Sequence, residues 1–365
     1  MSEPTSSAVR AFPCASCGAR VEYAPGTDVL RCPYCGYEQK VPAAERAVQE
    51  HSYAALAARA RKPVASLAAH VFVCRNCGAQ TESDAIAERC QFCGAPLVAE
   101  INAAELIAPE AVLPFAVDRE GVRTALRGWV ASRWFAPSSL KKVSEVEQVK
   151  GTYLPHWTYD AGTESDYAGM RGEHYWVTET YSVVVNGQSE TRTRQVQHTR
   201  WYPASGTVAR DFNDVLVPGT THVSNEQLGE LTPWPLEQAV PYRPDYLAGY
   251  HALRYDIEPE AGLAAAKAAM APVIESDCAR DIGGDVQQVH SVQTRYFEIM
   301  FKLLLLPVWI AGYLHGGRTY QVLINARTGE VYGERPYSVP KIVAAVLAAL
   351  VVIAAVAFLY LRTRR

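Results

Sequence analysis

The stretch FPCASCGARVEYAPGTDVLRCPYCG, residues 12–36, decides how the N-terminal part of the chain folds. It holds two Cys-x-x-Cys-Gly turns, and residues 72–98 repeat the arrangement as FVCRNCGAQTESDAIAERCQFCGAPLV. Two such turns facing each other supply four thiolates, the ligand set of a tetrahedral structural zinc. The eight predicted ligands are Cys14, Cys17, Cys32, Cys35, Cys74, Cys77, Cys90 and Cys93.

The glycine after each second cysteine supports this interpretation, because a tight turn often needs a positive φ that a Cβ disfavours. Two complete sets with near-equal spacing predict two structural Zn²⁺ ions. Rubredoxin-like iron and a disulfide framework are the alternatives. Each set defines a zinc ribbon too small to build a core of its own. The metal would therefore supply folding free energy on the order of 10 kcal/mol.

The C-terminal end is apolar without interruption from Ile342 to Leu361, between Lys341 and Arg362. Such a run covers about 30 Å as a helix, the thickness of the hydrocarbon core of a bilayer. The sequence therefore predicts a transmembrane helix at 341–361, with a single span over 342–361. A buried core helix is the alternative.

The expected location follows from two opposing signals. The arginines at the C-terminus favour a cytoplasmic tail under the positive-inside rule. Reduced zinc thiolates and a polar N-terminus without an apolar targeting segment favour a cytoplasmic bulk, and we give this argument more weight. The prediction is a tail-anchored protein of the bacterial inner membrane, with most of the chain in the cytoplasm.

Length and charge bound the remaining possibilities. A chain of 365 residues allows two or three units, and a formal net charge of -3 excludes a global attraction to nucleic acid or anionic lipid. The predicted units are a first ribbon at 10–41, a helical spacer at 42–69, a second ribbon at 70–100, and an α+β domain at 110–337.

The α+β domain is expected to be rich in antiparallel strands. Asn186-Gly187 separates two β-branched runs, 174–185 and a second one that ends at Trp201, which predicts a hairpin. The apolar run 303–314 is interrupted by a proline and is too short for a membrane helix, so a buried strand is predicted. The fold class is thus two small four-cysteine zinc ribbons, an α+β domain rich in antiparallel strands and one C-terminal transmembrane helix.

Helices of this domain are also marked in the sequence. Asp118 is a candidate N-cap for a helix that carries Val122, Leu126 and Trp129 on one face. The pattern Ser224-x-x-Gln227 is a capping box and starts a short helix. An Ala-rich helix is predicted from Pro259 to Met270.

The ribbons resemble a known family, together with the segments GTYLPHWTYDA (151–161) and LLLLPVWIAGYLHGGRTYQVLINARTGEVYGERP (303–336). The resemblance is to bacterial membrane-anchored double zinc-ribbon proteins, often catalogued as primosomal protein N′ (replication factor Y)-like or superfamily II helicase-like. It covers nearly the whole chain and implies zinc ligation by the eight cysteines and a membrane anchor. A helicase motor is not implied by these residues, because no Gly-Lys dipeptide for a P-loop and no Asp-Glu-x-His box occur.

Catalysis has little support in the sequence. Four-cysteine sites are closed, whereas catalytic zinc keeps an open position. Cys278, the ninth cysteine, is predicted to be a small buried hydrophobe, and His156 and His174 are predicted to be structural residues. The prediction is a protein that is not an enzyme and has no catalytic residue.

The partners follow from the charge of the ribbons. The first ribbon is nearly balanced and the second is acidic, which disfavours contacts with phosphates. The predicted function is therefore a tail-anchored membrane scaffold or adaptor whose ribbons dock a partner protein. The alternative is a membrane-tethered zinc-ribbon protein that binds nucleic acid in replication or transcription, with Tyr23, Tyr34 and Tyr37 near its first ribbon.

Overall fold

A computed structural model of the chain describes most of its residues. The described residues are 12–43, 46–58, 62–63, 70–74, 79–83, 90–92, 98–100, 105–133, 149–185, 188–315, 318–333 and 339–363.

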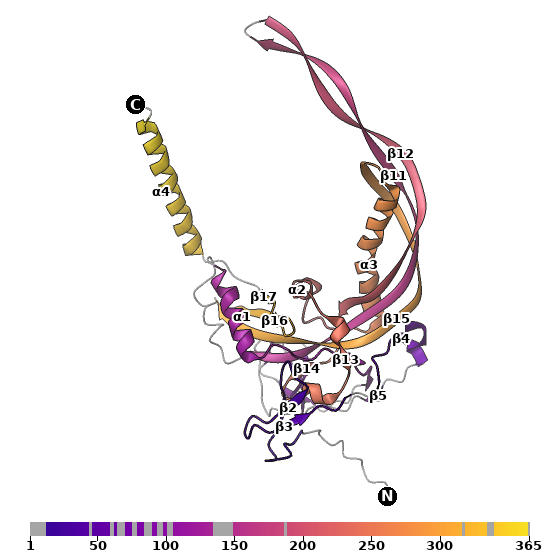
Figure 1. The fold of residues 1–365 in the computed structure, drawn as a ribbon, viewed down its shortest axis with the longest axis vertical. Helices are drawn as coiled ribbons and strands as arrows, with labels where there is room; N and C mark the ends of the chain where they lie inside the picture. Colours follow the sequence, from indigo (N-terminus) through magenta and orange to yellow (C-terminus); the bar gives the residue numbers. More distant parts are fainter. Residues whose placement is uncertain are drawn as a thin grey trace.

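Three long strands form the framework of the molecule. They are β11 (Lys150–Val185), β12 (Gln188–Pro218) and β15 (Val286–His315). β11 lies between the other two and pairs antiparallel with both. At about 3.4 Å per residue, β11 extends over roughly 120 Å of chain. Figure 1 shows these strands as a strongly curved ribbon whose upper part continues as β11 and β12 alone.

The predicted hairpin is confirmed by the register of β11 and β12, in which Val185 faces Gln188. Asn186 and Gly187 themselves lie outside the described residues. The strands are much longer than the sequence indicated, since β11 has 36 residues and β12 has 31. Alternation of Thr, Tyr and Val continues the β signal outward, so no residue between Lys150 and Val185 ends the strand.

The outer part of this hairpin, residues 175–198, is here called the arm. β15 reaches only to Gly172 of β11, where Val286 is its last partner. Beyond this point β11 and β12 pair with each other, and most arm side chains are exposed. The arm is therefore a two-stranded ribbon without a core of its own.

Helix α3 (Pro259–Ile282) covers one face of the long sheet. Leu263, Met270 and Ile274 are buried from the helix side, and Trp157 and Tyr159 from the sheet side. In Figure 1 the helix runs along the concave side of the curved strands. It begins as predicted at Pro259 but continues through Pro272 to Ile282, because its buried face continues with the same spacing.

Two shorter helices agree with the sequence analysis. α1 (Arg119–Ala131) is capped by the Asp118 carboxylate, which accepts from the Gly121 N–H at 2.8 Å. α2 (Asn225–Gly229) starts with the capping box of Ser224 and Gln227. These caps satisfy N–H groups that the first helical turn leaves without partners.

The short strands complete a sheet that is 12-stranded in the described residues. They are β4 (His51–Ser52), β6 (His70–Val73), β7 (Gln80–Ser83), β8 (Val98–Glu100), β10 (Ala111–Val112), β13 (Val240–Pro241), β14 (His251–Leu253), β16 (Arg318–Asn325) and β17 (Val331–Gly333). β10 runs parallel to β15, and β14 runs parallel to β11. The expected α+β domain is thus a mixed α/β domain rich in strands. The predicted strand over 303–314 lies in β15, and its residues 303–311 are buried.

The first ribbon forms a separate three-stranded antiparallel sheet of β1 (Glu22–Tyr23), β2 (Val29–Arg31) and β3 (Glu38–Lys40). Its inner face packs into the main core, where Val21, Tyr23 and Leu30 join Phe115 and Trp309. The ribbon is therefore held against the domain and shares its core.

The prediction of two separate ribbons in the fold class needs correction. Among the described residues one four-cysteine cluster is present, near the N-terminus. The strands of the second predicted ribbon, β6, β7 and β8, belong to the large sheet, because β7 pairs antiparallel with β14. The physical reason is that β14 offers a free edge whose hydrogen bonds β7 completes.

The segment 42–69, expected as a helical spacer, forms other elements where it is described. These are β4, the 3-10 helix η1 (Tyr53–Ala58) and β5 (Lys62–Pro63), which pairs with β9 (Glu105–Leu106). Two further 3-10 helices are η3 (Leu236–Gln238) and η4 (Pro244–Leu247). Contacts of Glu110 with Arg46 and His51 hold this part of the segment against the domain.

The last helix, α4 (Val339–Thr363), corrects the prediction of a membrane span. Over the residues that the structure describes, none of the helices provides an apolar stretch of the length that a bilayer crossing requires. A bilayer crossing takes roughly 30 Å of continuous apolar helix. The predicted transmembrane helix at 341–361 and the inner-membrane location derived from it are corrected accordingly.

Candidate metal centre

Two tight turns place the first four cysteines. In one turn the Gly18 N–H donates to the carbonyl of Cys14 at 2.9 Å, and in the other the Gly36 N–H donates to the carbonyl of Cys32 at 3.0 Å. Both glycines have φ 74°. This left-handed conformation explains why each Cys-x-x-Cys pair is followed by glycine.

The four sulfur atoms converge on one point. The Sγ atoms of Cys14 and Cys35 are 3.6 Å apart, and those of Cys17 and Cys32 are 3.5 Å apart. All four lie within 4.8 Å of one another. A tetrahedral zinc with Zn–S bonds of 2.3 Å would separate its sulfurs by about 3.8 Å. The cluster could therefore hold a metal ion such as zinc. A disulfide, with sulfurs about 2.05 Å apart, is a poor description of these pairs.

Backbone N–H groups favour the thiolate form of Cys32 and Cys14. At Cys17 the Ala19 N–H acts in the same direction, but hydrogen bonds with the sulfurs of Cys35 and Cys32 raise the pKa to about 12. The N–H of Cys35 and then that of Tyr34 lower the pKa of Cys32 to about 7, against an opposing effect of burial. The Ser16 N–H donates to the Cys14 sulfur at 3.4 Å. Burial raises the pKa of Cys14, but hydrogen bonds from the N–H groups of Cys17 and Ser16 bring it below its ordinary value. Thiolates are the form that binds metal.

The cluster has an inner and an outer side. Cys14 and Cys32 are buried against the domain, whereas Cys17 and Cys35 are exposed. The ring of Tyr34, which lies between Cys32 and Cys35 in sequence, is 82% exposed. The two Cys-x-x-Cys-Gly turns thus form part of the outer surface, while the inner face of the ribbon sheet packs against the domain.

The second predicted set is described only in part. Cys74 and Cys90 are both buried, in a cluster with Ala79 and Leu154. Cys77 and Cys93 lie outside the described residues, so the second zinc site stays a prediction.

The other residues considered in the sequence are placed in the core or on the arm. Cys278 is fully buried on the inner face of α3, and burial raises the pKa of its thiol. His156 is also fully buried, and burial lowers the pKa of its ring to about 4. His174 lies at the base of the arm, where its backbone N–H donates to the Asp285 carboxylate at 2.6 Å. The structure brings none of these three to the four-cysteine cluster.

A group of charged residues was missed by the sequence analysis. Glu50, Asp160 and Asp214 bring carboxylate oxygens within 4.8 Å of one another, and Lys302 contacts two of them. They come from four distant parts of the chain, so no spacing in the sequence could have revealed them. The one available signal was a lysine placed directly before the apolar run 303–306.

Comparisons with known proteins give one distant relative. The chain is 24% identical over 256 residues to the uncharacterized protein YdjG of Bacillus subtilis (strain 168). The match covers 69% of this chain and 70% of that protein. No protein-family model matches the chain. No solved structure matches it.

Proposed function

We propose that the protein is a non-catalytic adaptor that docks a partner protein, and that structural zinc stabilises its first ribbon. The observation that carries this proposal is the arm. A two-stranded ribbon with no core is marginally stable in water by itself. An arm of this length is best explained if its surface is covered when the protein works.

The chemistry of the arm suits a protein partner. Tyr175 and Trp176 are 40% and 62% exposed, and Tyr181 is 40% exposed. Aromatic side chains of this kind dominate the central contacts of protein interfaces. The strand edges of β11 and β12 along the arm also offer N–H and C=O groups to an added strand.

The charges of the arm are satisfied within the arm. Arg192 contacts Glu190 at 3.1 Å, and Arg194 contacts Glu179 at 2.9 Å. These four are the Arg, Lys, Asp and Glu residues of the arm sequence, so its formal charge is zero. A nucleic-acid surface needs cations free to neutralise phosphates, which makes the nucleic-acid alternative the weaker one.

The first ribbon would add a second contact surface. Tyr34 is 82% exposed and Tyr37 is 44% exposed, both beside the metal turns. Because the inner face of the ribbon is packed into the domain core, the backbone that carries these rings is held against the domain. Zinc in the first cysteine set, and in the second set as well, is part of the proposal, since four thiolates close the coordination sphere and leave no position for a substrate.

The proposal that the protein is not an enzyme rests on where Cys278, the candidate nucleophile, lies. Cys278 is 0% exposed, and burial raises its pKa, so its thiolate would be scarce and out of reach of a substrate. This environment is typical of a structural cysteine.

The proposal is tested by placing a photo-reactive amino acid at Trp176 in the full-length protein within its native cell. We expect a crosslink to one specific protein from this position and none from Val273, which is 40% exposed on α3 and serves as the control. The pair Trp176→Ala and Tyr181→Ala should weaken recovery of the same protein from an unmodified sample. Equal labelling from both positions would contradict the proposal.

A titration with single- and double-stranded DNA and RNA at low and at physiological salt tests the alternative. We expect no saturable binding. Binding that weakens steeply with salt would show phosphate contacts and would replace the adaptor with a nucleic-acid-binding protein.

A further inference from the structure

Four charged side chains meet on the face of the long sheet that lies opposite α3. The Lys302 ammonium donates to a Glu50 oxygen at 2.7 Å and to an Asp214 oxygen at 2.5 Å. The backbone N–H of Asp214 donates to an Asp160 oxygen at 2.6 Å. Lys302 is only 8% exposed. This group, Glu50, Asp160, Asp214 and Lys302, is called the acidic cluster below.

The sheet is deformed at the acidic cluster. On β12 the register shifts opposite Asp160, and Asp214 has φ 52°. On β15 it shifts at the same level, and Glu298 has φ 51°. Both are left-handed conformations that residues other than glycine seldom adopt. Bulges re-aim side chains, and the bulge at Asp214 turns its carboxylate toward Lys302, two strands away.

The acidic cluster carries more negative than positive charge. Three carboxylates face one ammonium, an excess of two negative charges when all are ionised. Buried charge without a counter-charge is costly. One divalent cation would neutralise the excess completely, whereas one proton would leave half of it.

A polar atom beside the acidic cluster lacks a partner. Thr158 is 1% exposed, and its hydroxyl has no hydrogen bond among the described residues. It lies directly opposite Lys302 in the register of β11 and β15, so both side chains project from the same face. Thr158 also precedes Asp160 by two residues on that face. A buried hydroxyl without a partner calls for an additional group at this place.

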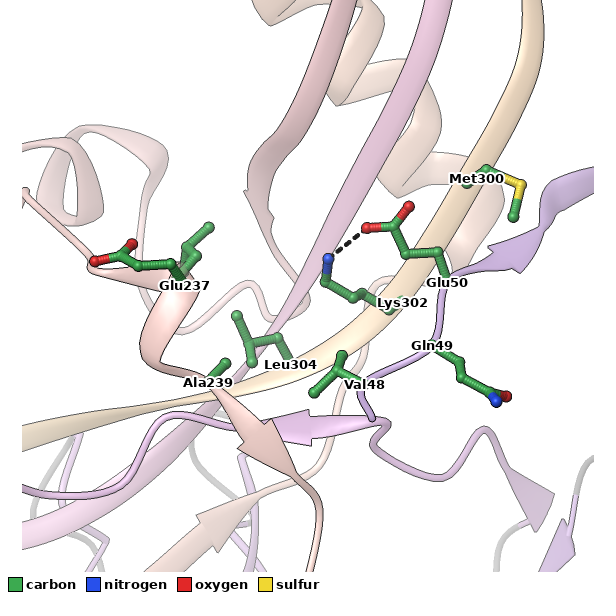
Figure 2. Close-up of a pocket in the computed structure, with 9 residues that line it drawn as sticks. Val48, Gln49, Glu50, Glu237, Ala239, Met300, Lys302 and Leu304 are labelled. Carbon is green, nitrogen blue, oxygen red and sulfur yellow. Dashed lines mark hydrogen bonds and ion pairs between the residues drawn. The ribbon is translucent and has the colours of Figure 1, made fainter. Parts of the chain in front are cut away.

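A cavity of about 630 Å³ lies beside the acidic cluster, with Glu50 and Lys302 in its wall. Its walls include Val48, Glu50, Glu237, Met300, Lys302 and Leu304. Figure 2 shows Lys302 pointing to Glu50, with the segment 48–50 on one side of the cavity and η3 on the other. The cavity gives an entry path and room for the water molecules that hard cations retain.

We propose that Glu50, Asp160, Asp214 and Thr158 bind a hard divalent cation, Ca²⁺, Mg²⁺ or Mn²⁺, next to Lys302. The donors are all oxygen atoms, the preference of these ions, and their carboxylates are close enough to share one ion. Lys302 stays in place as the remaining counter-charge. The site is chemically distinct from the four-cysteine cluster, whose sulfur ligands select soft or borderline metals such as zinc.

The test is a calorimetric titration of the full-length, zinc-loaded protein with CaCl₂, MgCl₂ and MnCl₂. We expect one equivalent of at least one of these ions to bind, with no loss of zinc. Asp160→Asn should weaken binding at least ten-fold, and Thr158→Val should weaken it several-fold. Glu237→Gln, which removes a carboxylate from the same cavity outside the cluster, should bind as the parent does.

Three outcomes would overturn the proposal. The first is no binding by the folded parent up to about 1 mM free metal, the weakest range of protein calcium sites. The second is unchanged binding in Asp160→Asn or in Thr158→Val. The third is equal weakening by Glu237→Gln, which would indicate diffuse attraction to the cavity. Circular dichroism of each variant separates loss of the site from loss of the fold, and Thr158→Val carries the test if Asp160→Asn does not fold.

Discussion

Cys17 allows the first four-cysteine set to be tested through a single exposed side chain. We expect Cys17→Ala to lose one zinc equivalent relative to the parent protein, measured by elemental analysis. The unfolding free energy should fall by roughly 4 kcal/mol or more, the range seen when a structural metal is lost. The matched control is Ser16→Ala, because only the backbone N–H of Ser16 contacts the Cys14 sulfur. Equal zinc content in Cys17→Ala and Ser16→Ala would contradict a zinc site at the first four cysteines.

Cys278 distinguishes a buried thiol from a reactive one. Cys278→Ala should leave partner binding unchanged and cost about 1 kcal/mol of stability or less, since it removes one small apolar atom. Cys278→Ser should cost more, because it buries a hydroxyl beside Met270 and Ile274 in an apolar cluster. Chemical denaturation of the two variants measures the difference. The reverse order of stability would contradict the core role.

Asp160 gives the stability of the protein a pH dependence. Its folded pKa is raised above its ordinary value to about 7, so the folded state holds a proton that the unfolded chain has released. The contribution of Asp160 to the free energy of unfolding is therefore largest at low pH and falls as pH rises toward 7. The charged groups that face Asp160 are Glu50, Asp214 and Lys302. The free energy of unfolding of Asp160→Asn and of the parent should be measured at pH 5 and pH 8 without added divalent cation. We expect the difference, variant minus parent, to be more positive at pH 8 than at pH 5. Asp166→Asn, an exposed carboxyl on the same strand, is the control.

The pairing of β11 with β15 depends on the absence of a side chain at Gly169. A Cβ there would lie 2.3 Å from the Gln288 carbonyl oxygen on β15 and 2.8 Å from the Ile282 side chain. We expect Gly169→Ala to destabilise the protein by about 1–3 kcal/mol, because the backbone must move.

The control for this prediction is Gly128→Ala. Gly128 is in helix α1 and has open space around its Cβ position. Alanine is the better helix former, so we expect a gain of about 0.5–1 kcal/mol there. Thermal and urea unfolding compare the two variants. Stability of Gly169→Ala equal to that of the parent would show that β15 can shift along β11 without cost.

Local elements were predictable from the sequence where one short pattern decides them. The Cys-x-x-Cys-Gly turns, the cap at Asp118 and the hairpin at Asn186-Gly187 are such patterns. The pairing of β7 with β14 was not predictable, because strand partners far apart in the chain are chosen by the whole sheet. The acidic cluster was missed for the same reason. Its members meet only after three strands and the segment 46–50 have assembled.

At the scale of the whole molecule, the arm should behave as an addition to a complete domain. Replacing residues 175–198 by a two-residue Asn-Gly turn should leave the unfolding temperature within a few degrees of the parent, since the arm contributes no residue to the buried clusters. Small-angle scattering should show a clear loss of maximum dimension, because the arm extends over about 37 Å. Partner recovery should be lost. Unfolding of the whole domain on this deletion would contradict the independence of the arm.

The length of the arm also marks where sequence reasoning reaches its limit. Alternating polar and β-branched residues predict strands, but they do not indicate how far β15 pairs along β11. β15 leaves β11 at Gly172, and from there the same sequence pattern forms a two-stranded ribbon in place of a three-stranded sheet. Exposure of Trp176 depends entirely on that point of departure.

The first ribbon packs against parts of the domain core that are synthesised much later than the ribbon itself. Its strands leave the ribosome early, whereas the Tyr250 hydroxyl that binds the Tyr23 carbonyl lies 227 residues later. At roughly 5–20 residues per second, this interval lasts about 10–45 s. During it the four thiols can capture their metal while the apolar back of the ribbon is still uncovered. For the zinc-loaded protein proposed above, we therefore expect metal uptake to precede the packing of the ribbon against the later part of the chain.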